Sequence, residues 1–144
     1  MKYLLAAFAL SLAAAGAVQA APLDAELLSL AQRWDHANFE IKDAAMRLTE
    51  LKKLQSEAAT LSGKNPKSAD PIAWEGIIAS SEAGASSGLG ALGFAKDAKK
   101  LFEKAAALNG NALGDGSVNT SLGSLYAQVP GFPIGFGDAG KAKQ

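Results

Sequence analysis

Apolar side chains recur at helical intervals through much of the chain, which predicts a protein built from amphipathic helices. The longest such stretch, residues 23–62, contains neither Gly nor Pro. Charged side chains lie beside its apolar stripe. Globular helices rarely reach this length. We therefore expect this leading helical block to break near His36 to Glu40 or to form an antiparallel pair, and the sequence leaves both options open.

Turn signals divide the remainder into further helices. The Gly- and Pro-containing segment 63–71 predicts a turn, with Asp70 as the N-cap of the helix that follows. The glycine-rich residues 84–93 predict a loop, and Asp115 or Ser117 is expected to cap a later helix. The predicted helices each carry an apolar face, and they span about residues 71–83, 94–108 and 115–128.

Residues 129–137 form a Pro- and Gly-rich loop that carries three large apolar side chains, Phe132, Ile134 and Phe136. Ordinary surface loops are polar, so we expect this loop to fold back onto the helices. The alternative is that its apolar side chains line a binding groove. Asp138 is expected to cap a short final helix.

Two half-motifs in this part of the chain have the spacing of tetratricopeptide helix pairs. The pattern A-x3-F-x2-A is formed by Ala98, Phe102 and Ala105. The pattern L-G-x2-Y is formed by Leu122, Gly123 and Tyr126. Small residues let helices approach closely, and the aromatic rings fill the space between them. We predict an all-α fold of antiparallel helix pairs stacked as a short tetratricopeptide-like array, with units at 71–110 and 115–144.

Two segments resemble those of small exported proteobacterial proteins, which are similar in turn to the T component (TatT-like) associated with TRAP-type solute transporters. The segments are Ile72-Ala-Trp-Glu-Gly-Ile-Ile-Ala-Ser-Ser-Glu-Ala-Gly84 and Ser121-Leu-Gly-Ser-Leu-Tyr-Ala-Gln-Val-Pro-Gly-Phe-Pro-Ile-Gly-Phe-Gly-Asp138. The resemblance implies a further helix after the Gly-Phe-Gly-Asp loop. Because none follows here, the second unit is expected to be incomplete, with an uncovered apolar face around Leu122, Leu125 and Tyr126 that favours homo-oligomers.

The start of the chain has the features of a secretory signal peptide. Lys2 precedes an apolar run over 3–15, and Val18-Gln19-Ala20 supplies small residues at the cleavage positions. We expect a signal peptide at 1–20, cleavage after Ala20, and a periplasmic mature chain of one domain, 21–144, without a membrane anchor. Without Lys2, the mature chain has 13 basic against 14 acidic side chains, which does not favour nucleic-acid binding.

The chain lacks the side-chain groupings of a catalytic or metal site. It has no Cys and a single His, His36. The sequence spacing does not place both an acidic side chain and a nucleophile next to that histidine. Gly88, Gly90 and Gly93 spell G-x-G-x-x-G, but no buried strand precedes them, as a dinucleotide site requires. We therefore predict a non-enzyme with no cofactor and no metal.

These observations favour a non-catalytic periplasmic scaffold that binds a protein or peptide partner. The alternative, implied by the resemblance, is a TRAP-associated accessory that binds a small hydrophobic or carboxylate solute and passes it to a solute-binding protein. The candidate binding residues are aromatic side chains, Trp74, Tyr126, Phe132 and Phe136. For Trp74 a place in the core is the competing interpretation.

Overall fold

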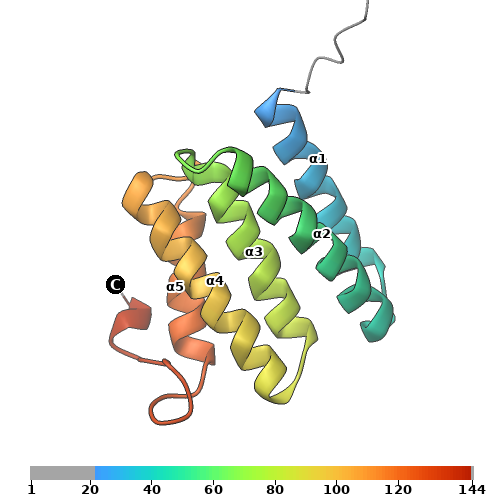
Figure 1. Cartoon of the computed structure of the whole chain (residues 1–144). Coiled ribbons are helices and arrows are strands. Elements are labelled where there is room, and N and C mark those ends of the chain that lie inside the picture. Colours follow the sequence, from blue (N-terminus) through green and yellow to red (C-terminus); the bar gives the residue numbers. More distant parts are fainter. Residues whose placement is uncertain (1–21, 144) are drawn as a thin grey trace, which may run out of the picture.

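A computed structural model describes residues 22–143, which form an all-helical protein (Figure 1). The five α-helices are α1 (Leu23–Asp35), α2 (Ala44–Lys64), α3 (Ala69–Ala85), α4 (Gly88–Leu108) and α5 (Ser117–Gln128). A π-helical turn, η1 (His36–Glu40), follows α1, and a 3-10 turn, η2 (Lys141–Lys143), follows the last loop. The all-α prediction is confirmed for this part of the chain, whereas the predicted signal peptide lies outside the described residues.

Helix α3 lies at the centre of the fold. It packs most extensively against α4 on one side and then against α2 on the other, while α1 and α5 also touch it (Figure 1). Only residues 86 and 87 separate α3 from α4, so the chain turns back at once and the two helices run antiparallel. Helix α5 packs on α4 and carries the final loop and η2.

The leading block consists of two helices. Helix α1 gives way to η1 over His36–Glu40, and α2 begins after Asp43, whose Oδ1 accepts a hydrogen bond from the Met46 N–H at 2.8 Å. The sequence left open a break near His36 to Glu40 or a pair of helices. The structure has both, because the break at η1 divides the block into α1 and α2. The Arg33 Nη2 group donates to Glu57 Oε1 at 2.9 Å and joins α1 to α2.

The core has two parts. The first, which we call the α3–α5 core, is rich in alanine and is built around Phe102. The second, the α1–α3 core, contains Leu30, Ala37, Leu51, Leu54, Ala58 and Ile78. Predicted packing residues Ala98, Phe102 and Ala105 have no exposed area, so all three belong to the α3–α5 core as their spacing indicated.

Phe102 is accommodated by a glycine on the facing helix. A Cβ atom at Gly76 would lie 2.9 Å from Cε1 and 3.0 Å from Cδ1 of the Phe102 ring, which is closer than carbon atoms pack. Only a residue without a side chain allows the ring to rest against the backbone of α3. Gly123 instead approaches η2: its Cβ would lie 3.1 Å from the Ala142 carbonyl oxygen, so the expected neighbouring helix is here a single turn.

The predicted starts of α3, α4 and α5 are wrong. Helix α5 has Gly116 as its N-cap residue, so neither Asp115 nor Ser117 caps it. Helix α4 begins at Gly88, within the segment 84–93 that was expected to be a loop. Helix α3 begins after Ser68, and the Asp70 side chain does not cap it. Asp70 Oδ1 instead accepts a hydrogen bond from the Leu113 N–H at 2.9 Å, which ties the turn before α5 to the start of α3. At Asp70, a contact with a distant part of the chain therefore outweighs the local capping preference.

The last part of the chain covers α5 in part. Asp138 Oδ1 accepts hydrogen bonds from the Gly140 and Lys141 N–H groups, so it caps η2, one turn in place of the short helix that was predicted. The expected uncovered face is smaller than predicted: Leu125 is buried, and Leu122 and Tyr126 are half-buried.

Candidate functional site

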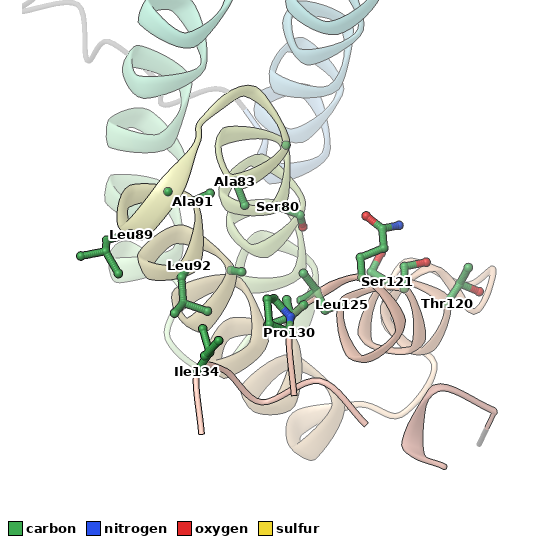
Figure 2. A pocket seen from close by; sticks show the side chains of 16 residues that line it. Ser80, Ala83, Leu89, Ala91, Leu92, Thr120, Ser121, Leu125, Pro130 and Ile134 are labelled. Atoms are coloured by element: carbon green, nitrogen blue, oxygen red, sulfur yellow. The ribbon is translucent and has the colours of Figure 1, made fainter. Parts of the chain in front are cut away.

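A pocket of about 720 Å³ lies between α3, α4, α5 and the loop 129–137 (Figure 2). Its apolar wall comes from small side chains of α3 and α4 together with larger ones of α4, α5 and the loop. These residues include Ala83, Ala91, Leu92, Ala95, Leu125, Val129, Pro130 and Ile134. A polar edge is formed by Ser80, Thr120, Ser121, Ser124 and Gln128. The volume falls in the range of small-molecule sites.

Small residues near the α3–α4 connection leave the space for this pocket. Ala83 and Gly84 end α3, and Gly88 and Ala91 begin α4, so these facing surfaces have little side-chain volume. Larger residues there would fill the hollow. Leu89 and Leu92, also near the start of α4, line the mouth of the pocket, and Leu89 is 86% exposed there.

The loop 129–137 closes the pocket on the α5 side. The Gly137 N–H donates to the Pro130 carbonyl at 3.0 Å, and the Asp138 N–H donates to the Tyr126 carbonyl at 2.9 Å. A Cβ atom on Gly137 would overlap the Val129 carbonyl oxygen, so the two ends of the loop meet only because this residue is glycine. The loop is therefore a closed, tightly bonded structure whose position is fixed relative to α5.

The predicted aromatic residues do not share one site. Phe136 packs edge-on against Tyr126, with ring centroids 5.8 Å apart, and both rings are half-buried. Lys99 Nζ lies 5.8 Å and Lys141 Nζ 5.4 Å from the Tyr126 centroid, so cations flank this pair. The aromatic pair anchors the loop and η2 to α4 and α5, and neither ring is among the residues that line the pocket.

Phe132 and Trp74 have opposite environments. Phe132 is 94% exposed, so the expectation that the loop folds back onto the helices holds for Phe136 and fails for Phe132. Trp74 is half-buried against the α1–α3 core, where its ring meets Trp34 edge-on at 5.8 Å. Trp74 therefore packs at the edge of the α1–α3 core, as the competing interpretation proposed.

Charge is absent from the pocket wall. Of the described residues that line it, none is acidic or basic. Glu82, next to the lining residue Ala83 in sequence, is 2% exposed, and this burial raises the pKa of its carboxyl group. Lys52 opposes that rise and Asp97 adds to it. The pocket can therefore accept an apolar body and offer it hydroxyl and amide hydrogen bonds.

Other chemistry is sparse in the part of the chain that the structure describes. No three metal-ligating side chains gather between Pro22 and Lys143. His36 is exposed, and its Nδ1 lies 2.8 Å from Glu40 Oε2 on the same turn. None of the helices in this range has the length and apolar character needed to cross a bilayer.

Comparison with known proteins adds no assignment: no family model, curated protein or solved structure matches the chain. The site is therefore defined by its geometry.

Sequence reasoning missed most of the pocket residues, since it placed binding on aromatic side chains. The many Ala and Gly residues over 83–95 could have indicated the pocket. Where small residues cluster on facing helices, either the helices pack closely or a hollow remains between them.

Proposed function

We propose that this protein is a non-catalytic periplasmic binding protein whose pocket holds a small hydrophobic molecule. The observation that carries the proposal is the hollow of about 720 Å³, apolar on most sides and uncharged among its described lining residues. Transfer of an apolar group into such a wall is favourable by roughly 25 cal/mol for each Å² removed from water. The hydroxyl groups along one edge would orient the ligand.

The wall chemistry favours a hydrophobic solute over a carboxylate. An ionised carboxylate that leaves water needs a cation or several hydrogen-bond donors to offset its desolvation. Ser80, Thr120 and Ser121 supply hydroxyl groups, but no basic side chain is among the described residues of the wall. Of the two solute classes that the resemblance to TRAP-associated proteins implies, the neutral one therefore fits this pocket.

The architecture supports a tetratricopeptide-like assignment as part of the same proposal. Helices α3 and α4 form an antiparallel pair around Phe102, and α5, which carries Leu122-Gly123, packs on α4 with η2 after it. Pairs that stack in this way expose grooves between successive units. The signal-peptide features of residues 1–20 support export.

A protein partner is the second candidate, and the exposed loop favours it. Phe132 is 94% exposed and Ile134 66% exposed, on a loop whose ends are fixed by hydrogen bonds. A rigid aromatic side chain displayed in this way is typical of interface anchors. Because Ile134 also lines the pocket, a partner docked on this loop, such as a transporter solute-binding protein, would meet the ligand at the pocket mouth.

The test of ligand binding is a titration of the mature chain with a neutral hydrophobic dye, N-phenyl-1-naphthylamine, followed by fluorescence. Ser124→Trp, on the exposed part of the pocket wall, should lower the dye affinity about tenfold or more, because the indole occupies the hollow. Ala127→Trp is the matched control: it is exposed on the same helix and is not among the lining residues. Non-saturable binding, or equal affinities in the two variants, would refute the proposal.

A further inference from the structure

A second, smaller hollow adjoins the pocket. Its volume is about 370 Å³, and it is lined by residues of α1, α3 and α5 and of the turn before α5. Ser80, Thr120 and Ser121 line both hollows, so the two meet along this row of hydroxyl groups. Figure 2 places Ser80 on α3 and the other two side chains on α5. A ligand long enough to pass these hydroxyl groups would therefore reach the second hollow.

The chemistry changes along this path. The pocket end is apolar and includes Leu92, while the far end contains Asp115. Among the described residues that line either hollow, Asp115 is the one with a charge. Trp34 forms an aromatic wall beside it, and its indole N–H donates to Ser81 Oγ at 2.8 Å, which fixes the ring.

The Asp115 carboxylate is held in place. Its Oδ1 accepts hydrogen bonds from the Ser117 N–H at 2.9 Å and from the Ser117 hydroxyl at 2.5 Å. These bonds lower the pKa of Asp115, so the group is negatively charged at neutral pH. A fixed negative charge beside an aromatic ring attracts an ammonium group and repels a carboxylate.

We infer that the ligand is a cationic amphiphile, with its apolar body in the pocket and an amine or quaternary ammonium end at Asp115. This inference rests on the proposed function and adds the class of polar group. The two hollows together follow α5 from Ser117 to Gln128, about 16 Å of helix at 1.5 Å a residue. An extended decyl chain fits within that length.

The experiment compares decylamine, decanol and decanoate, which share a chain and differ in the polar end. Each is titrated against the mature protein loaded with N-phenyl-1-naphthylamine, at low ionic strength and neutral pH. Decylamine should displace the dye at about two- to fivefold lower concentration than decanol, the effect of one exposed charge, and decanoate should be the weakest. Added salt should reduce the difference.

Asp115→Asn isolates the charge, because the amide oxygen can still accept the Ser117 N–H bond. The variant should lose the preference for decylamine and keep its affinity for decanol. Asp97→Asn removes an equal charge from an exposed position on α4 that is not among the lining residues of either hollow, and it should change neither affinity.

The outcomes separate the two proposals. If all three compounds displace the dye equally, or if Asp115→Asn leaves the preference for decylamine unchanged, the inference about the polar end is wrong and the hydrophobic pocket remains. If decanoate binds best, the inference is also overturned. If the dye itself does not bind, the proposed function fails, and the inference fails with it.

Discussion

Adding one methyl group at Gly76 tests how closely the two central helices pack. In a Gly76→Ala variant the new Cβ would lie 2.9 Å from Phe102 Cε1 and 3.3 Å from Leu101 Cβ. Phe102 has no exposed area, and Ala98 and Ala105, one turn away on either side, are equally buried. The ring therefore cannot turn outward, and α3 and α4 must separate by several tenths of an ångström.

Two opposing effects set the magnitude. Alanine is favoured over glycine inside a helix by about 0.8–1.0 kcal/mol, and overpacking a close-packed core costs about 1–3 kcal/mol. The expected net loss at Gly76 is about 1 kcal/mol. Gly93→Ala is the matched control, because Gly93 lies inside α4 with no atom within 4 Å of its Cβ position. The control should gain about 0.5–1 kcal/mol, so the two variants differ by roughly 1–3 kcal/mol.

The assay is urea unfolding at 25 °C, followed by far-ultraviolet circular dichroism. The midpoint should fall for Gly76→Ala and rise for Gly93→Ala, with unchanged slopes. Combining Gly76→Ala with Phe102→Leu should cost less than the sum of the two single changes, because the smaller side chain relieves the overlap. Equal stabilisation by both Gly→Ala variants would show that α3 and α4 do not meet as closely as described.

Two further predictions concern a buried charge and an exposed ring. The folded-state pKa of Glu82 lies above its ordinary 4.5, so its contribution to stability is greatest below that pH and decreases as pH rises through the folded pKa. Glu82→Gln should therefore raise Tm at pH 7 and leave it unchanged near pH 3; a lower Tm at pH 7 would contradict this. Phe132→Ala should weaken capture of a periplasmic solute-binding protein without changing Tm or dye affinity, and undiminished capture would exclude Phe132 from an interface.

Helix faces were predictable where spacing alone determines them. Ala98, Phe102 and Ala105 lie one turn apart, so any helix that includes them places all three on one side, and their burial follows. The partner of that face was not predictable in the same way. Gly76 receives the Phe102 ring although 26 positions separate them, and no local pattern specifies that pairing. The Asp70 carboxylate likewise meets the Leu113 N–H across 43 positions, which local capping rules miss.

The glycine-rich start of α4 shows why local propensity misassigned the pocket region. Each glycine costs a helix about 1 kcal/mol relative to alanine, and this favours a loop when the segment is considered alone. In the folded chain the helix begins at Gly88, and it carries Leu92 in the pocket wall and Ala95 in the α3–α5 core. The small residues Gly88 and Ala91 at this start of α4 leave room for the hollow beside it.

The final loop completes the wall of that hollow where α5 ends. Helix α5 buries only Val118 and Leu125, and its contact with α4 is much less extensive than that between α3 and α4. Val129 and Ile134 occupy the gap at its C-terminal end, on a loop whose two ends are bonded together through Gly137. Because the same loop lines the pocket through Val129, Pro130 and Ile134 and displays Phe132 to solvent, a partner bound at Phe132 would sit beside the mouth of the proposed ligand site.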